Sequence, residues 1–411
     1  MSTKKGISKI PAVIGGVIMA GLLCLGVYSF IDSTKGNTKL PTNEKPGDKN
    51  NSSLSSTPST GTSSVRFMAV GDNLIHDTIY KQAAERADGG AYDFSYAYAD
   101  VADILSKADL SFINQETIID SSKEPSTYPL FNSPAQLGDE MVKLGFNVVN
   151  MANNHVLDMN YDGAISAIAY WKNKGVTLTG AYESEDDMYT VKKNISNGIT
   201  FSYVGVTSYL NGFNINPDET NLRVVSLTDD YRSEEEIDAS IEKMIKLADE
   251  QSDVVVVSMH WSVENVTQTS EAQEKWVQQL VNWGADIIIG TGPHSLMPVK
   301  YVDKPDGGQA VVFYSLGNFI SAQSDAINMP SGIADIVIEK DNASNKTSIK
   351  SVDFIPTITY YGDSQADLRI LKFANYNTDM VHGISDMNYD YAKNLYETVI
   401  GKEFISLFRN E

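Results

Sequence analysis

The stretch "VVNMANNHVLD", residues 148–158, joins a short apolar run to a pair of asparagines and a histidine. An unbroken apolar run of this kind is typical of a strand that is buried on both faces of a parallel sheet. In open α/β sheets, ligands bind just beyond the carboxyl ends of the strands. The stretch therefore predicts a strand that ends by presenting Asn153, Asn154 and His155 to a binding site.

Similar apolar runs recur through residues 65–325 and alternate with helical patterns. The runs are "VRFMAV", "ADLSFI", "ITFSYVGV", "DVVVVSM", "ADIIIG" and "AVVFYSL". Between them, Ser233 and Glu236 form a capping box before one amphipathic helix, and a second amphipathic segment ends at Gly284. Strands that alternate with helices predict an α/β fold built from βαβ units, with a largely parallel sheet.

The last part of the chain, residues 326–411, has a different pattern. The runs "GIADIVIEK" and "SIKSVDFIPTITYY" flank the turn-rich "DNASNKT", which predicts two antiparallel strands joined as a hairpin. A helix is expected over residues 391–400. We expect these C-terminal strands and this helix to complete the domain that residues 65–325 begin.

The first 31 residues differ from the rest of the chain. Three lysines, Lys4, Lys5 and Lys9, precede an uncharged run at residues 10–31 that is long enough to span a bilayer as one helix. A cleaved signal peptide is the alternative, but no small-residue cleavage pattern follows the run closely, so an uncleaved anchor is favoured. This pattern predicts a single-pass protein of the cell membrane whose C-terminal domain is extracytoplasmic.

Residues 32–64 are almost free of apolar side chains. Such a segment cannot bury enough surface to offset its ordering entropy, so we expect a flexible polar tether between the anchor and the folded domain. The only cysteine, Cys24, lies in the predicted anchor. The chain therefore has no intrachain disulfide, and the stability of the domain must come from its core.

Composition limits the classes of partner. Hydrophobic residues make up 42% of the chain and charged residues 21%, which is typical of a globular protein. The chain has 32 basic and 53 acidic residues and a net charge of −21. This charge repels phosphate backbones, so nucleic acid is not expected as a partner. An anionic polymer would need local cations or a metal to be held.

Six predicted strands carry polar residues at or just beyond their carboxyl ends. In chain order these residues are Asp72, Asn114, Glu116, Asn153, Asn154, His155, His260, Glu264, His294 and Asn318. A lone histidine after a strand is usually a hydrogen-bonded loop residue. Here four of the five histidines, including His76 shortly after Asp72, fall near strand ends. The joint occurrence favours one shared site.

The chemistry of this set points to a metal. The candidate ligands offer carboxylate, amide and imidazole donors without thiolate: Asp72, Glu116, Asn154, His260 and His294. This mixture suits Mn, Fe or Zn in an open site better than a structural zinc cage. With two ions about 3.5–4 Å apart, Glu116 would bridge them and a hydroxide would attack a phosphate ester. His155 would then serve as the general acid.

The remaining candidates have open roles. Asn114, Asn153, Glu264, Asn318 and His76 are expected to contact substrate or to orient the ligands. Two of them have an alternative: Glu264 also fits a solvated loop acid, and His76 fits a surface residue on the first helix. The asparagine pair also fits a turn closed by hydrogen bonds from side chains to the backbone.

Six motifs, in order, resemble the CapA (PgsA-type) poly-γ-glutamate capsule biosynthesis family. They are "VGDNLIH", "NQETII", "NMANNHVLD", "SMHWSVE", "GADIIIGTGPHSLMPV" and "FYSLGNF", and the resemblance covers about residues 65–325. It implies a calcineurin-like metallophosphoesterase fold, a four-layer sandwich of two mixed β-sheets flanked by helices. It also implies a part in making or exporting an anionic cell-surface polymer, with the polymer or its precursor and membrane synthase or export subunits as partners.

The resemblance also bears on individual residues. The five candidate ligands match metal-ligand positions of the metallophosphoesterase pattern, and His155 matches the histidine beside the ligating asparagine. Two positions depart from it, because Thr291 and Leu74 stand where histidines are usual. These departures leave a single-ion site, a loosely held second ion, or a fold that binds without hydrolysis. The expected function is therefore either a metal-dependent phosphoesterase-like hydrolase or a non-catalytic accessory subunit that holds polymer or partners in the same cleft.

Overall fold

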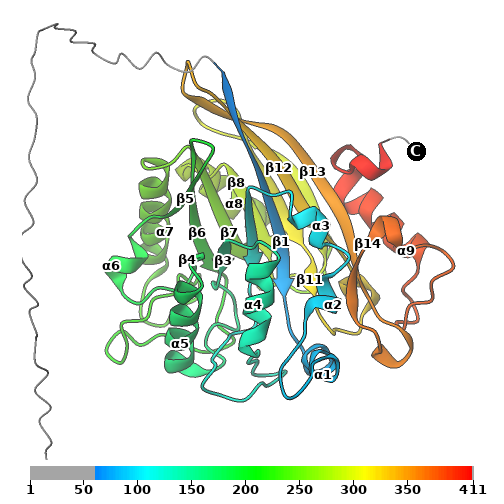
Figure 1. Ribbon diagram of the computed structural model, residues 1–411. Helices are drawn as coiled ribbons and strands as arrows, with labels where there is room; N and C mark the ends of the chain where they lie inside the picture. The colour runs from blue at the N-terminus through cyan, green and yellow to red at the C-terminus, as the bar shows by residue number, and fades with distance from the viewer. Residues whose placement is uncertain (1–60, 410–411) are drawn as a thin grey trace, which may run out of the picture. The chain divides into compact units, whose positions relative to one another are not determined.

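Two β-sheets pack against each other in the computed structural model, which describes residues 61–409 (Figure 1). The first sheet has the order β14-β13-β12-β1-β2-β3-β4, with β11 also paired to β1, and the second has the order β5-β6-β7-β8-β10-β9. The strands of the first sheet are β1 (Thr62–Asn73), β2 (Leu110–Asn114), β3 (Val148–Asn150), β4 (Thr177–Thr179), β11 (Asn318–Ile320), β12 (Pro330–Asp341), β13 (Lys346–Tyr360) and β14 (Arg369–Lys372). Those of the second are β5 (Lys192–Ser196), β6 (Ile199–Thr207), β7 (Val254–His260), β8 (Ile287–Thr291), β9 (Leu296–Asp303) and β10 (Gln309–Leu316).

The centre of each sheet is parallel and the edges are antiparallel. In the first sheet β1 to β4 run parallel, and β12, β13 and β14 add in antiparallel fashion. In the second, β6, β7, β8 and β10 run parallel between the antiparallel edge strands β5 and β9. The expected βαβ pattern is confirmed, with its parallel strands divided between two sheets. Because parallel neighbours share one direction, their carboxyl ends gather at the same edge of each sheet.

The unbroken apolar runs are explained by burial on both faces. In β7, Val254 and Val256 face the cluster that includes the space between the sheets, whereas Val255 and Val257 face the cluster that includes the covering helices. This alternation follows from the two-residue repeat of a strand. Between the sheets, the rings of Phe67 on β1 and Phe201 on β6 stack with centroids 5.9 Å apart.

Helices cover the outer faces of both sheets and complete a four-layer arrangement. On the second sheet, α7 (Glu234–Asp249) and α8 (Glu271–Trp283) bury their apolar faces. The predicted capping box at Ser233 and the predicted stop at Gly284 are both present. On the first sheet, the longer covering helices are α4 (Ala135–Lys143) and α5 (Asn160–Asn173) (Figure 1). The shorter helices are α1 (Asp77–Arg86), α2 (Ser95–Tyr98), α3 (Ala102–Leu105) and α6 (Glu185–Met188).

The C-terminal elements extend the first sheet. Strands β12 and β13 form the predicted antiparallel hairpin, and β12 pairs with β1 along residues 62–69. The predicted final helix is also present, as α9 (Tyr389–Leu395) followed by a π-helical segment (Tyr396–Gly401). One boundary was wrong: β1 begins at Thr62 rather than after residue 64, because Thr62 pairs with Asp341 of the long hairpin. The backbone of residues 62–64 thus gains ladder hydrogen bonds that its polar composition does not reveal.

The predicted membrane anchor at residues 1–31 lies outside the described residues, as does nearly all of the predicted tether. Within residues 61–409, no helix combines the length and the apolar character needed to cross a bilayer.

Candidate metal centre

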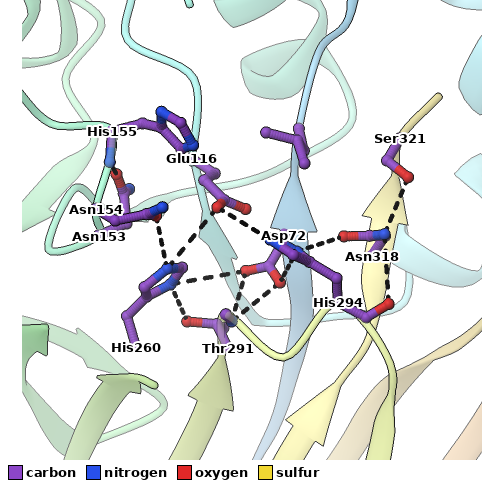
Figure 2. Close-up of polar contacts among 12 residues, drawn as sticks. Asp72, Glu116, Asn153, Asn154, His155, His260, Thr291, His294, Asn318 and Ser321 are labelled. Atoms are coloured by element: carbon purple, nitrogen blue, oxygen red, sulfur yellow. Dashed lines mark hydrogen bonds and ion pairs between the residues drawn. The ribbon is translucent and has the colours of Figure 1, made fainter. Parts of the chain in front are cut away.

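Strand ends from both sheets converge on one buried cluster (Figure 2). Asp72 is the second-last residue of β1 in the first sheet, and Glu116 and Asn154 follow β2 and β3. His260 ends β7 of the second sheet, and His294 follows β8. All five are at most 3% exposed. The structure therefore brings together the five side chains that the sequence pattern predicts as metal ligands.

Three of these side chains form the tightest group. Ligand atoms of Asp72, Glu116 and His294 all lie within 4.8 Å of one another. His294 Nδ1 is 3.1 Å from Asp72 Oδ2, and His294 Nε2 is 3.7 Å from Glu116 Oε1. Among residues 61–409, neither carboxylate oxygen of Glu116 has a hydrogen-bond partner, although both are buried. Burying a carboxylate without a partner is costly, so this arrangement fits a cation between the three groups.

Asn154 and His260 adjoin this group. His260 Nε2 lies 2.9 Å from Asn154 Oδ1 and 3.8 Å from Glu116 Oε1. The amide nitrogen of Asn154 donates to the hydroxyl of Tyr209 at 3.1 Å and to Oδ1 of Asn211 at 3.2 Å. These two bonds assign the oxygen of Asn154 to the side that faces His260. A mixed set of oxygen and imidazole donors matches the preferences of Mn, Fe or Zn.

The electrostatics of the cluster favour positive charge. Burial and the nearby charge of Asp72 raise the pKa of Glu116 well above its usual range. Burial would lower the pKa of His294, but Glu116 and Asp72 raise it to about 10. Burial likewise opposes ionisation of Asp72, yet hydrogen bonding and the charge of His294 hold the pKa of Asp72 below its usual value. For His260, burial outweighs the charge of Asp72 and lowers the pKa to about 3. The single positive charge of the His294 ring is too little to neutralise both Asp72 and Glu116. A divalent cation bound between them would neutralise both carboxylates.

The backbone of the loop after β8 holds the carboxylate of Asp72 in place. The N–H of Gly292 donates to both oxygens of Asp72, at 3.2 and 3.0 Å. Gly292 has a φ of 95°, and a Cβ there would meet the carbonyl oxygen of Trp261 at 2.3 Å. Only glycine therefore lets this loop approach so closely. Two residues on, His294 also adopts a left-handed φ of 58°, which is uncommon for a non-glycine residue and is often found at functional sites.

A family comparison is decisive once this geometry is known. The model of the family described as "Bacterial capsule synthesis protein PGA_cap" matches residues 66–323. This chain belongs to that family. It is 28% identical over 226 residues to "PGA biosynthesis protein CapA" of Bacillus subtilis (strain 168), covering 53% of this chain and 54% of the relative. It is 31% identical over 182 residues to "Capsule biosynthesis protein CapA" of Bacillus anthracis, covering 44% and 41%. The chain spans about half the length of these curated relatives.

A solved structure described as a novel phosphatase from Mycoplasma pneumoniae is also similar. It covers 72% of this chain and 95% of its own, with a TM-score of 0.41 and 12% identity.

Two supporting residues of this PGA_cap protein orient the ligands. Asn318 Oδ1 lies 3.0 Å from His294 Nδ1, and its amide nitrogen donates to Ser321 and Gln323. Since the neighbours of Nδ1 are acceptors, Nδ1 carries the hydrogen and Nε2 is left for an ion. Asn114 donates to Asp72 Oδ1 at 2.8 Å. Asn318 and Asn114 thus hold two of the candidate ligands, His294 and Asp72, in place.

Asn153 and His155 lie on the turn that follows β3. Asn153 Oδ1 accepts the N–H of His155 at 3.1 Å, so this asparagine closes the turn. His155 Nδ1 lies 2.7 Å from Asp158 Oδ2, and its ring meets the edge of Phe131 with centroids 4.8 Å apart. With Nδ1 engaged, Nε2 is the nitrogen of His155 that remains for a substrate.

His76 and Glu264 lie at the margin. His76 is partly buried, accepts the N–H of Ala322 at Nδ1 and packs against Phe131, and burial lowers its pKa to about 4. It is thus half-buried and not a surface residue. Glu264 is exposed, and the hydrogen bonds of His260 go to other groups.

Thr291 and Leu74 stand where histidines are usual in the metallophosphoesterase pattern, and the structure shows what each contacts. The hydroxyl of Thr291 lies 3.0 Å from His260 Nδ1, where it fixes the ring without supplying a ligand nitrogen. Leu74 is buried at 3% exposure and belongs to the apolar interior. Neither position offers an imidazole, so the donor-rich part of the site is the side formed by Asp72, Glu116 and His294.

Sequence reasoning missed three residues of the site. Asp158, which holds His155, had a weak signal, because it follows the histidine by three residues on a turn. Tyr209 and Asn211, which hold Asn154, come from the long loop after β6. Nothing in that loop marks them, since their role depends on where the second sheet packs against the first.

Proposed function

We propose that this protein is a metal-dependent phosphoesterase-like protein that acts in the synthesis or export of an anionic capsule polymer of the poly-γ-glutamate class. Membership of the PGA_cap family and the names of the Bacillus relatives support the polymer. The observation that supports metal-dependent chemistry is Glu116, beside Asp72 and His294: its two buried oxygens have no hydrogen-bond partner in the part of the chain that the structure describes. The basic and apolar segment at residues 1–31 supports a membrane anchor with the domain outside the cell.

Asp72, Glu116 and His294 would hold the ion, with Asn154 and His260 beside them. A bound divalent cation would supply Lewis-acid stabilisation of charge on a phosphoryl group. The protein excludes water around this charge by burying all five side chains. Gly292, Asn114 and Asn318 hold Asp72 and His294 in place, so the ligand set is organised before substrate arrives.

His155 is the proposed general acid. Its Nδ1 is bonded to Asp158, which also accepts the N–H of Phe131 at 2.7 Å and is 3% exposed. Asp158 therefore sets the tautomer and the direction of the ring, as carboxylates commonly do for catalytic histidines. A proton held at Nε2 can be donated to the oxygen of a leaving group.

The test uses the full chain purified in detergent. We expect it to retain a divalent metal and to hydrolyse p-nitrophenyl phosphate or bis(p-nitrophenyl) phosphate in a metal-dependent manner. His155→Ala should lower kcat by about 10²–10⁴-fold, the usual contribution of a general acid, while the metal content stays unchanged. A protein without metal and without turnover would contradict the proposal. The protein would then be a non-catalytic accessory subunit that holds polymer or partner proteins.

A further inference from the structure

An apolar lip, consisting of Tyr128, Leu130 and Phe131, borders the proposed catalytic histidine. Phe131 is buried at 1% exposure and contacts the rings of His155 and His76, at centroid distances of 4.8 and 5.2 Å. Tyr128 lies against Phe131 at 6.4 Å but is 73% exposed, and Leu130 is 43% exposed. Two large apolar side chains are thus presented to solvent next to the site.

The loop that carries the lip is held in place by many hydrogen bonds. The side-chain nitrogen of Asn132 donates to the carbonyls of residues 120, 123 and 124, and the backbones of Ser126 and Asn132 pair at 2.9 and 3.1 Å. The loop is also joined to α1, because Thr127 Oγ1 accepts the N–H of Asp77 at 3.2 Å. A surface ordered in advance costs little further entropy when it binds a ligand. The hydrogen bonds of this loop therefore hold Tyr128 and Leu130 in their exposed positions.

The loops around the site carry far more acidic than basic side chains, and each basic one already has a partner. The loops that follow β1, β2, β3, β6, β7, β8 and β11 contain three basic residues, Lys123, Arg223 and Arg232. Lys123 donates to the carbonyl of Met159 and forms an ion pair with the carboxylate of Asp120. Arg223 donates to carbonyls of its own loop, and Arg232 pairs with Asp229. The same loops carry ten acidic residues: Glu116, Asp120, Glu124, Asp158, Asp218, Glu219, Asp229, Asp230, Glu264 and Asp325. A ligand with many negative charges would be repelled here.

The contact between Phe131 and His155 places the lip at the end of the substrate that carries the leaving group. In the hydrolysis proposed above, the oxygen of water forms a new bond to phosphorus, and the bond from phosphorus to the leaving oxygen breaks with its electron pair. The leaving oxygen takes the proton from His155 Nε2, and a proton of the water later restores His155. Because Phe131 packs on His155, the lip lies on the leaving-group side.

We propose that the substrate is a phosphoester whose leaving group is an uncharged ring that packs on Tyr128 and Leu130. This inference rests on the proposed phosphoesterase function and narrows it. The polyanionic polymer itself is not bound at this site. Aromatic and sugar rings both pack on tyrosine faces, and the experiment below separates these two sources.

The test compares three esters on the wild-type chain and on the double variant Tyr128→Ala/Leu130→Ala. Two esters carry rings, p-nitrophenyl phosphate and glucose 1-phosphate, and the third, β-glycerophosphate, has an acyclic leaving group. We expect the double variant to raise KM about tenfold for at least one ring-bearing ester, with little change in kcat. KM for β-glycerophosphate should stay the same. The ester with the larger effect identifies the ring as aromatic or sugar.

Controls distinguish recognition from a general disturbance. Tyr128→Phe keeps the ring and should keep the wild-type KM. Val381→Ala alters a side chain that is also 73% exposed but lies in the C-terminal segment, and it should change none of the three KM values. Poly-γ-glutamate should not inhibit competitively.

Three results would overturn the inference. They are equal KM changes for all three esters, unchanged KM values in the double variant, and competitive inhibition by poly-γ-glutamate. A wild-type chain that hydrolyses none of the esters, in the presence of metal, would overturn the proposed function as well.

Discussion

At the scale of single residues, Glu116 is the group that its surroundings satisfy least. It is 1% exposed, Asp72 and His294 lie next to it, and its oxygens find no hydrogen-bond partner among the described residues. Asp158 has one buried oxygen without a partner, but its other oxygen accepts from Phe131 and meets His155. Asn154 has partners at both ends of its amide, in His260, Tyr209 and Asn211. Glu116 is therefore the carboxylate whose charge most needs a bound cation.

Thr291 provides the first prediction, because its hydroxyl is 3.0 Å from His260 Nδ1. Thr291→Val keeps the shape of the side chain but removes this contact, so His260 loses the partner that orients its Nδ1 side. We expect affinity for Mn²⁺ or Zn²⁺, measured by titration calorimetry, to fall about 10–100-fold, as is usual when an orienting partner is lost. Thr291→Ser should stay near wild type. Equal affinities for the valine and serine variants would show that the hydroxyl has no such role.

At the scale of elements, parallel strands explain why the ligand set was predictable. Each candidate ligand stands at or just beyond the carboxyl end of an apolar run, and parallel strands deliver such positions to one edge. The apolar runs are legible because both faces of β7 and β8 are buried. Contacts made by loops are different, since Phe131 meets His155 only through the path of an irregular segment after β2. No periodic pattern encodes such a path.

The turn after β8 gives a prediction about stability. A Cβ at Gly292 would meet backbone atoms of Trp261, the nearest at 2.3 Å, and φ there is 95°. Gly307 has a similar φ of 88°, yet a Cβ there would meet nothing within 4 Å. We expect Gly292→Ala to lower the free energy of unfolding by about 3–5 kcal/mol and Gly307→Ala by only about 1 kcal/mol.

Urea unfolding of the two glycine variants, followed by circular dichroism, measures this difference. Gly307→Ala serves as the matched control, because it shares the backbone strain and lacks the steric overlap. Equal losses for both variants would mean that the close approach of the Gly292 loop does not matter. Gly292→Ala should also weaken metal binding, because its N–H holds Asp72.

At the scale of the whole molecule, charge and architecture set the terms for function. The net charge of −21 opposes accumulation of an anionic polymer on the protein, and the basic residues of the site loops are already engaged. A part in capsule synthesis that turns over a small phosphoester fits this charge better than one that grips the finished polymer. The division of the strands between two sheets could not be derived from the residues, because strands buried on both faces look alike wherever they lie. The prediction of two sheets came instead from the resemblance to a known family.

The most direct test of a metal centre is the metal content of the full chain and of Glu116→Gln. Glutamine keeps the size of the side chain but removes its charge, and so removes most of the attraction for a cation. After exhaustive dialysis, elemental analysis should find about one or more divalent ions per wild-type chain and less than about a tenth of that in the variant. A wild-type chain that retains no ion, or a variant that retains as much as wild type, would contradict the account.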